Sequence, residues 1–341
     1  SVSRDETGAA DVIEKFMRDN GCTPERSGNN VWCKSADFSP TKPTLLLNSH
    51  IDTVKPIAGW TYDPFQPTED EEGRLYGLGS NDAGASVVSL LASFLWLTQR
   101  PQPYNLIFLA SCEEEVSGRN GIESVLPMLP PITVAIVGEP TGMNPAVAEK
   151  GLMVLDGEIT GVSGHAARNE GVNAIYKAVL AVETLRTLSL PKESAYLGPV
   201  KISVTQINAG TQHNVVPDTC RFVVDVRTTD AYSNEETVEI LRAALRSDAV
   251  PRSTRIRAAA VGGEHPLVKA AVAAGRETYV SPTTSDRTLM PFPALKMGPG
   301  QSSRSHTADE FVLLGEIAEG IAIYEKYIEK LAQEYGWKTL G

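Results

Sequence analysis

The segment NLIFLASCEEE, residues 105–115, joins a short apolar run to three consecutive glutamates. Two further segments, TLLLNSHID at residues 44–52 and TVAIVGEP at residues 133–140, have the same form, an apolar run that ends in polar residues. Apolar runs of about five residues, bounded by turn-forming residues, are typical of strands buried on both faces of a parallel sheet. The three segments therefore predict the central strands of an α/β domain.

Helical segments separate and follow these strands. GASVVSLLASFLWL, residues 84–97, lies between the first two predicted strands and has an apolar face at helical spacing. Parallel strands need such a crossover connection. Towards the end of the chain, residues 265–277 and 313–335 predict two more helices, and residues 293–300 predict another strand. We expect a mostly parallel sheet flanked by helices.

The middle of the chain has a different pattern. Apolar and polar residues alternate in GLMVLDGEITG (151–161), VKISVTQINAG (200–210) and DTCRFVVDVRTT (218–229). Such alternation is typical of antiparallel strands with one face exposed to water. Residues 172–188 and 233–247 predict amphipathic helices beside them. The middle of the chain therefore predicts a small α+β domain.

The order of these segments predicts an inserted domain. A length of 341 residues favours two domains over one. Residues 1–150 and 262–341 are predicted to form one domain, and residues 151–261 a second domain inserted into it. The helix at 233–247 has a capping-box arrangement, with Ser233 at its start and Glu236 three residues later.

Composition narrows the partners and the location. The net charge of −11 argues against nucleic acid and anionic membranes as main partners, because both favour a basic surface. No apolar run approaches the ~20 residues of a membrane span, and the first residues lack a signal-peptide pattern. The four cysteines are scattered without a Cys-x-x-Cys pair, which predicts reduced, mostly buried thiols. We expect a cytoplasmic protein.

Potential metal ligands follow each predicted parallel strand. Functional groups of open parallel sheets gather at the carboxyl ends of the strands, so these side chains are expected to lie at one edge. The candidates are His50 and Asp52, Asp82 at the start of the crossover helix, Glu113 to Glu115, Glu139 and His306. Each alone has a structural explanation, such as a helix N-cap for Asp82 or a hydrogen-bonded loop position for His50. Together, carboxylates without interleaved lysine or arginine would repel one another unless a multivalent cation neutralised them.

The number and type of donors indicate two ions. Five donors exceed the four of a tetrahedral zinc site but suit two divalent ions that share a carboxylate. Mixed imidazole and carboxylate ligands favour zinc, with cobalt or manganese as alternatives. Asp52, two residues from His50, fits the partner that holds the imidazole tautomer. The proposed ligands are His50, Asp82, Glu115, Glu139 and His306.

At this point the chain resembles a known family, the two-zinc amidohydrolases and peptidases that include acetylornithine deacetylase, succinyl-diaminopimelate desuccinylase, aminoacylase and carboxypeptidase G. The matching motifs occur in the family's order from about residue 45 to residue 311. They are SHIDTV, GLGSNDAGAS, SCEEEVSGRNG, VGEPTG, GVSGHAAR, HNVVPD, DVRTTD, TTSD and GPGQSSRSHTADEF. The resemblance implies a zinc-exopeptidase-like fold with an inserted domain that serves for dimerisation and as a lid.

The resemblance also implies a role for each ligand. His50, Asp82 and Glu139 would bind one zinc, and Asp82, Glu115 and His306 the other, with Asp82 bridging. The family has a general base directly before a ligand, and a glycine usually lies six residues beyond that ligand. Gly121 lies six residues beyond Glu115. This spacing makes Glu114 the base and Glu115 the ligand, and leaves Glu113 at a position often occupied by another acid.

Residues outside the ligand set are assigned by the same resemblance. His165, in the Gly-His motif, would reach across a homodimer interface into the partner's active site. Asn214, Arg227, Ser285, Gly298 and Gly300 are candidates for holding the substrate's α-carboxylate, although each also fits a structural role, as His165 does. His265 is expected at the surface, and His213 matches no metal position.

One motif departs from the family pattern. Relatives commonly have Asp-x-Lys-Gly where this chain has Asp82-Ala83-Gly84-Ala85, so the lysine is missing. The family also implies a cis peptide after the bridging aspartate.

The implied reaction is hydrolysis of an N-acyl amino acid. The expected substrate is N-acetyl- or N-succinyl-L-ornithine, as in arginine biosynthesis. Succinyl-diaminopimelate desuccinylase is the nearest alternative, followed by an aminopeptidase or dipeptidase. Other classes fit less well. Asp82 stands where a dinucleotide-binding Gly-x-Gly-x-x-Gly needs its third glycine, and the chain has no Gly-x-Ser-x-Gly elbow.

Overall fold

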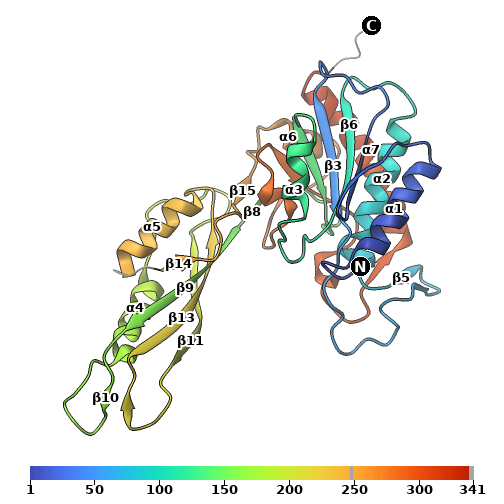
Figure 1. Cartoon of the computed structure of the whole chain (residues 1–341). Helices are drawn as coiled ribbons and strands as arrows, with labels where there is room; N and C mark the ends of the chain where they lie inside the picture. The colour runs from blue at the N-terminus through green and yellow to red at the C-terminus, as the bar shows by residue number, and fades with distance from the viewer. Residues whose placement is uncertain (246–248, 338–341) are drawn as a thin grey trace. The chain divides into compact units, whose positions relative to one another are not determined.

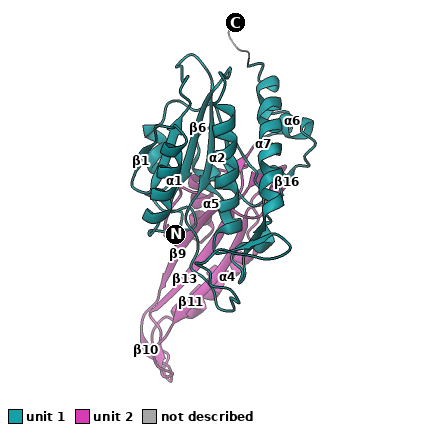
Figure 2. Ribbon diagram, turned by 90° about the vertical axis from the view of Figure 1, so that its right-hand side faces the viewer, with its two compact units in different colours: residues 1–147, 261–279, 285–341 teal, residues 148–260, 280–284 magenta. Residues whose placement is uncertain are grey.

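The computed structural model describes residues 1–245 and 249–337 (Figure 1). The chain forms two compact units (Figure 2). Unit 1 comprises residues 1–147, 261–279 and 285–341, and unit 2 comprises residues 148–260 and 280–284. The chain thus leaves unit 1 and returns to it.

Unit 1 is built on a mixed sheet with a parallel centre. Its strands run in the order β1-β2-β6-β3-β7-β17. β3 pairs in parallel with β6 and β7, and β17 continues the parallel array beside β7. The strands are β1 (Glu25–Ser27), β2 (Asn30–Lys34), β3 (Thr44–His50), β6 (Asn105–Ser111), β7 (Val134–Gly138) and β17 (Ala294–Lys296). The predicted α/β fold with a mostly parallel sheet is confirmed.

The helices of unit 1 cover both faces of this sheet. Residues of α1, α2, α6 and α7 join the core on one face, and residues of α3 join the core on the other. The helices are α1 (Thr7–Asp19), α2 (Ala85–Leu97), α3 (Ile122–Val125), α6 (Pro266–Ala273) and α7 (Leu314–Glu334). A small antiparallel sheet of β4 (Thr68–Glu69), β5 (Arg74–Tyr76) and β18 (Phe311–Leu313) completes the unit.

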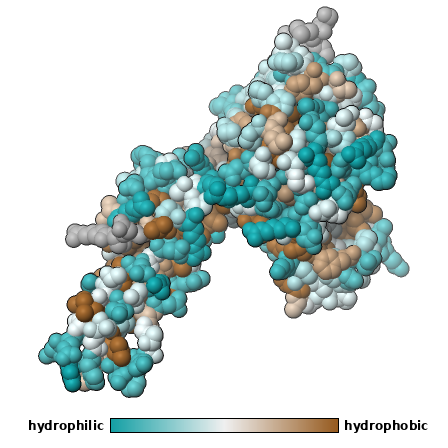
Figure 3. All heavy atoms as spheres, in the orientation of Figure 1, coloured by the Kyte–Doolittle hydropathy of each residue, from teal (hydrophilic) through white to brown (hydrophobic). Residues whose placement is uncertain are grey.

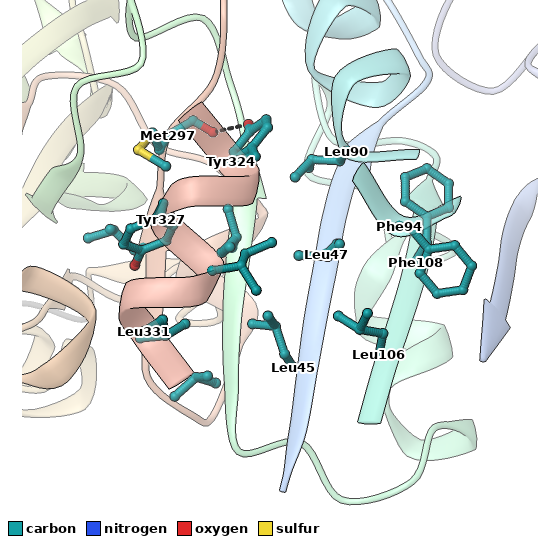
Figure 4. Packing of buried hydrophobic residues seen from close by; sticks show 14 of the residues in the cluster. Leu45, Leu47, Leu90, Phe94, Leu106, Phe108, Met297, Tyr324, Tyr327 and Leu331 are labelled. Atoms are coloured by element: carbon teal, nitrogen blue, oxygen red, sulfur yellow. Dashed lines mark hydrogen bonds between the residues drawn. The ribbon is translucent and has the colours of Figure 1, made fainter. Parts of the chain in front are cut away.

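Burial on both faces explains the continuous apolar runs. Leu45 and Leu47 of β3 belong to the core beneath α2 and α7, whereas Leu46 belongs to the core on the opposite face. Figure 4 shows the first of these cores, in which Tyr324 of α7 donates a hydrogen bond of 2.6 Å to the carbonyl of Met297. The buried tyrosine hydroxyl is thereby satisfied, as a polar group in an apolar core requires.

Unit 2 is an antiparallel sheet with helices on one face. The strand order is β11-β13-β9-β14, and Val224 of β13 pairs with Leu155 of β9. Apolar residues from one face of these strands pack with α4 and α5. Its elements are β9 (Gly151–Thr160), β10 (Gly164–His165), α4 (Ala174–Thr187), β11 (Lys201–Ala209), β12 (Val215–Val216), β13 (Thr219–Thr228), α5 (Asn234–Leu245) and β14 (Val250–Pro251).

The capping box predicted at the start of α5 is present. The backbone N–H of Glu236 donates to Ser233 Oγ at 3.0 Å, and the backbone N–H of Ser233 donates to Glu236 Oε2 at 2.7 Å. Residues 246 and 247, the end of the predicted helix, lie outside the described residues.

Three short strands lie where the chain passes between the units: β8 (Ala146–Glu149), β15 (Ala259–Ala260) and β16 (Tyr279–Ser281). The four cysteines are free thiols. The face of the molecule in Figure 3 is mostly hydrophilic, with apolar residues in scattered groups. Among the described residues, no helix combines the length and apolar character needed to cross a membrane.

Candidate metal centre

The parallel strands bring the predicted ligands to one edge of the sheet. His50 is the last residue of β3, Glu139 directly follows β7, and Glu115 follows β6 after a short turn. Asp82 lies in the turn η1 (Ser80–Gly84) that precedes α2, and its peptide bond to Ala83 is cis, as the resemblance implies. His306 lies in the loop between η4 (Ser302–Arg304) and β18.

The two carboxylate oxygens of Asp82 face different imidazoles. Asp82 Oδ1 lies 3.2 Å from His50 Nε2, and Asp82 Oδ2 lies 3.6 Å from His306 Nε2. Glu139 Oε1 lies 3.7 Å from His50 Nε2, and Glu115 lies 3.1 Å from His306 Nε2. The five predicted ligands therefore form one cluster, divided into two sets that share Asp82.

Glu114 also reaches this cluster. Its Oε2 lies 4.0 Å from His50 Nε2. Ligand atoms of His50, Glu114 and Glu139 all lie within 4.8 Å of one another, as do those of His50, Asp82 and Glu115. The two adjacent glutamates thus approach different members of the ligand set.

Glu113 points away from the cluster. Its backbone has a positive φ of 56°, and its Oε1 accepts a hydrogen bond of 2.9 Å from Asn120 Nδ2. Its Oε2 accepts from the backbone N–H of Asn120 at 3.4 Å. Of the three consecutive glutamates, only the last two contribute to the site.

Asp52 contacts both His50 and the segment that carries Glu114 and Glu115. Its carboxylate accepts hydrogen bonds from the backbone N–H groups of Glu114 and Glu115 at 2.9 and 3.1 Å. His50 Nδ1 lies 2.9 Å from the carbonyl oxygen of Asp52 and 3.5 Å from its carboxylate. The nearer carbonyl can only accept, so Nδ1 carries the proton and Nε2 is left facing the cluster as a lone-pair donor. The expected support of His50 therefore comes from the backbone of Asp52, while its carboxylate holds the two glutamates.

The shifted pKa values of the cluster residues favour the binding of cations. Burial raises the pKa of Glu139 to about 8, although the charge of Lys296 opposes this shift. Burial likewise holds the pKa of Glu114 well above its usual value. Burial opposes protonation of His50, but the contacts with Asp52 and Asp82 outweigh it and raise its pKa. Divalent ions would replace these protons, because metal binding requires deprotonated ligands.

A buried oxygen supports the same conclusion. Among the described residues, Glu139 Oε1 is a buried side-chain atom that has no hydrogen-bond partner. Buried carboxylate oxygens are normally paired or bound to a metal. The imidazole and carboxylate donors of this cluster therefore fit two divalent ions.

Two contributors escaped the sequence analysis. Lys296, buried in β17, acts on Glu139 through its charge. Asp286, buried in the TTSD motif, accepts a hydrogen bond of 2.6 Å from Ser111 Oγ, and its charge raises the pKa of Glu114. The motif signalled this region, but its serine, not its aspartate, was singled out.

The predicted substrate residues of unit 1 have local structural roles. A Cβ on Gly298 would lie 2.5 Å from the carbonyl oxygen of Glu139, and one on Gly300 would lie 2.3 Å from Asn81 Oδ1. Both glycines therefore permit close backbone packing beside ligand-bearing loops. Ser285 is buried at the start of the 3-10 turn Asp286–Leu289, where its carbonyl accepts from Thr288 Oγ1.

The predicted functional residues of unit 2 lie on strands or, for Asn214, in the turn before one. His165 is exposed in β10, and its Nδ1 accepts from the backbone N–H of Ala167 at 3.1 Å. Asn214 is also exposed. It lies close to His165, because its carbonyl oxygen accepts a hydrogen bond from the backbone N–H of Ala166. Arg227 forms two hydrogen bonds with Asp225, at 2.9 and 3.2 Å.

The two remaining histidines lie apart from the ligand cluster. His213 is exposed in unit 2. His265, expected at the surface, is partly buried and caps α6 by accepting from the backbone N–H of Leu267 at 3.3 Å.

Imidazoles and carboxylates gathered around a shared aspartate, at the edge of a mostly parallel sheet, define a dinuclear metallohydrolase. The chain belongs to peptidase family M20/M25/M40, whose family model matches residues 46–330. This membership confirms the family resemblance, and the chain is therefore a metal-dependent hydrolase.

Curated relatives carry two different names. The chain is 29% identical over 314 residues to an acetylornithine deacetylase of Proteus mirabilis, a match that covers 83% of this chain and 80% of the relative. It is 30% identical over 228 residues to a succinyl-diaminopimelate desuccinylase of Paracoccus denitrificans. That second match covers 62% of this chain and 59% of the relative, less than two thirds of its length.

Solved structures share the fold. A tripeptidase of Staphylococcus aureus matches with a TM-score of 0.76 at 18% identity, covering 98% of this chain and 95% of that one. A dinuclear metal-binding peptidase of the M20 family from Bacillus subtilis matches with a TM-score of 0.71, also at 18% identity, covering 100% and 95%. At this identity the likeness concerns the fold alone.

Removal of a ligand that binds only one of the two ions is expected to release that ion. The unsubstituted chain, loaded with zinc and freed of excess, should carry about two ions. His306→Ala should carry about one, because His306 lies on only one side of Asp82. Glu113→Gln is the matched control and should keep about two, because Glu113 is bonded to Asn120. Elemental analysis measures the ratio, and an unchanged ratio in His306→Ala would contradict the ligand set.

Proposed function

We propose that the chain hydrolyses the amide bond of an N-acyl amino acid, with N-acetyl- or N-succinyl-L-ornithine as the substrate, as in arginine biosynthesis. The position of Glu114 carries the hydrolytic part of this proposal. Its carboxylate reaches the cluster, yet the five other side chains suffice to hold two ions, so it is free to move a proton. The acetylornithine deacetylase relative supports the choice of ornithine. The predicted cytoplasmic location remains part of the proposal.

Each side of the cluster would hold one ion. His50 and Glu139 would bind one and Glu115 and His306 the other, with Asp82 shared between them. Zinc suits this mixed donor set, with cobalt and manganese as alternatives. When bound, the ions would polarise the substrate carbonyl and lower the pKa of a water molecule.

Glu114 would carry the proton through the reaction. It takes a proton from the attacking water and later returns it to the leaving amine, whose departure completes the hydrolysis. Asp52 holds the backbone N–H of Glu114 at 2.9 Å and so fixes where this carboxylate stands. His165 of the partner subunit would stabilise the oxyanion that develops on the substrate, a contact typically worth ~3 kcal/mol.

Recognition of the amino acid is assigned to the remaining candidates. Arg227 has the planar fork that suits a carboxylate, and Asn214 offers an exposed amide. Binding at Arg227 would compete with its contacts to Asp225. Ser285, Gly298 and Gly300 complete the candidates for holding the α-carboxylate; Ser285 is buried, and both glycines are closely packed against neighbouring segments.

Two alternatives rank behind the ornithine derivatives. The relative from Paracoccus denitrificans favours succinyl-diaminopimelate as the second candidate. An aminopeptidase or dipeptidase is third, since fold likeness to a tripeptidase carries no substrate information.

The inserted unit is proposed to form a homodimer. The exposed face of α4 carries three apolar side chains, Tyr176, Val179 and Leu180, which are 73%, 55% and 70% exposed. Beside α4, β11 is an edge strand of its sheet, so within residues 1–245 and 249–337 one side of its backbone has no strand partner. An apolar helix face next to an open strand edge suits pairing with a second copy.

Replacement of the base should stop turnover without loss of metal. Glu114→Gln is expected to lower kcat by about 100- to 10,000-fold and to keep both ions, because its neighbours supply the ligands. Glu113→Gln is the control and should stay near the unsubstituted rate, since its side chain is bonded to Asn120. Steady-state kinetics and elemental analysis measure both. A large loss of kcat in Glu113→Gln, together with a normal kcat in Glu114→Gln, would make Glu113 the base in place of Glu114.

A substrate panel separates the candidates. Metal-loaded protein should be assayed with N-acetyl-ornithine, N-succinyl-ornithine, N-acetyl-citrulline, succinyl-diaminopimelate and a tripeptide. We expect kcat/KM for one of the ornithine derivatives to exceed that for every other compound by about tenfold or more. A higher value for succinyl-diaminopimelate or the tripeptide would replace ornithine in the proposal.

A charge on the α4 face should separate the subunits. Leu180→Glu is expected to be monomeric in analytical ultracentrifugation, because it buries a carboxylate in the apolar contact. Val272→Glu, at a 59% exposed position of α6 in unit 1, is the matched control and should stay dimeric. Mixed His165→Ala and Glu114→Ala chains should recover activity by subunit exchange. A monomeric unsubstituted chain, or mixtures that stay inactive, would count against the shared site.

A further inference from the structure

A buried glutamate outside the ligand set holds the turn that carries the shared aspartate. Glu310 is 2% exposed and lies four residues after His306, directly before β18. Its Oε1 accepts hydrogen bonds from the backbone N–H groups of Asn81 and Asp82, at 3.1 and 2.8 Å. Its Oε2 accepts from the backbone N–H of Gly79 at 3.0 Å. Three backbone donors of the turn thus converge on one carboxylate.

The backbone of Glu310 is tied to the same turn. Its carbonyl oxygen accepts from the backbone N–H of Gly77 at 3.1 Å. Directly after it, β18 pairs with β5, where Phe311 lies opposite Tyr76. The carboxylate therefore stands on a backbone fixed by a strand pair, which prevents it from following movements of the turn.

A second contact runs in the opposite direction. Asn81 is fully buried, and its Nδ2 donates to the carbonyl of Gln301 at 3.1 Å and to Ser305 Oγ at 3.3 Å. Its Oδ1 accepts from the backbone N–H of Gln301 at 2.9 Å. Asn81 thus holds the segment before His306, while Glu310 holds the segment that ends in Asp82. Hydrogen bonds therefore join the loop that supplies Asp82 to the loop that supplies His306.

We propose that Glu310 is a positioning residue for the dinuclear centre, which aims the shared carboxylate of Asp82 at both halves of the ligand cluster. The inference rests on the proposed ligand set. Glu310 belongs to neither group of converging ligand atoms among the described residues, and both of its oxygens accept from backbone N–H groups. Its action on the ions goes through the orientation of Asp82.

The carboxylate form is essential to this arrangement. A glutamine at position 310 would have one oxygen and one NH2 group, and the NH2 group cannot accept a hydrogen bond. In either amide orientation a backbone N–H would face another donor, either at Gly79 or at both Asn81 and Asp82. A buried donor without an acceptor destabilises the arrangement that contains it, so the turn would shift and the carboxylate of Asp82 with it.

Metal titration of the apoprotein tests the proposal. Zinc binding to the unsubstituted chain, Glu310→Gln and Asp70→Asn should be measured by titration calorimetry. Absorption spectra of the cobalt forms should report the ligand geometry. We expect Glu310→Gln to bind zinc about 10- to 100-fold more weakly and to give an altered cobalt spectrum. Asp70→Asn is the matched control, because Asp70 accepts backbone N–H groups of Glu72 and Arg74 at 3.0 and 2.9 Å away from the ligands. It should match the unsubstituted chain.

A second variant separates geometry from charge. Glu310→Asp keeps the charge but draws the carboxylate back by one methylene, so it should also bind zinc more weakly; it is measured too if Glu310→Gln does not fold. Normal zinc affinity and a normal cobalt spectrum in either folded variant would overturn the proposal. An unsubstituted chain that takes up no divalent ion would overturn the metal centre and the inference with it. Normal zinc binding without turnover of any panel compound would refute the proposed substrate and leave the role of Glu310 standing.

Discussion

The mutual repulsion of buried carboxylates around Asp82 is the constraint on which the site depends. Asp82, Glu114, Glu115 and Glu139 come together with two imidazoles in a partly buried cluster. Burial first, and the neighbouring carboxylates second, raise the pKa values of Glu114 and Glu139, so that without cations both carboxylates favour the protonated form. Divalent ions neutralise the carboxylates and bind them as ligands. The cluster is therefore unfavourable without ions and favours metal binding.

The scaffold supplies rigidity where the ligands converge. His50 and Glu139 stand at the ends of adjacent parallel strands, whose pairing fixes their spacing. Glu114 and Glu115 lie in a turn, which a single carboxylate, that of Asp52, holds through two backbone N–H groups. Because consecutive residues are anchored through their backbones, their side chains diverge, and each reaches a different part of the cluster. One buried aspartate thus separates a proton carrier from a ligand.

Much of this fold could be predicted because burial on both faces leaves a clear trace in sequence. Residues 45–47 and 106–110 form uninterrupted apolar runs, since neighbouring residues of each strand enter opposite cores. The strands β1 and β2, at one end of the sheet, were not predicted. β2 (Asn30–Lys34) is short and acquires its place by pairing with β6, a tertiary contact that no local pattern encodes. Its five residues carry too little periodicity to indicate a strand alone.

The candidate site was predictable to the extent that strand ends converge. The ligand candidates follow strand ends or flank helices, and the structure brings all five together. Contacts that depend on side-chain direction were not predictable. The support of His50 by a backbone carbonyl and the burial of Lys296 near Glu139 leave no mark in residue spacing. Gly298 and Gly300 illustrate the same limit, because residue spacing does not encode the close approach of neighbouring segments at either glycine, and their role in substrate binding stays a prediction.

The missing lysine after Asp82 shows how the centre compensates locally. In the Asp-x-Lys-Gly pattern the lysine corresponds to Gly84, where a Cβ would lie 2.5 Å from the carbonyl oxygen of Gly79, so this position has no room for a lysine side chain. The neighbouring Asn81 instead fixes the turn through neutral hydrogen bonds to Gln301 and Ser305. Neutral contacts provide order without neutralising the carboxylates, so the charge of the cluster is left for the ions to balance. In the absence of the lysine, hydrogen bonds therefore hold this turn in place, and the metal ions balance the charge of the carboxylates.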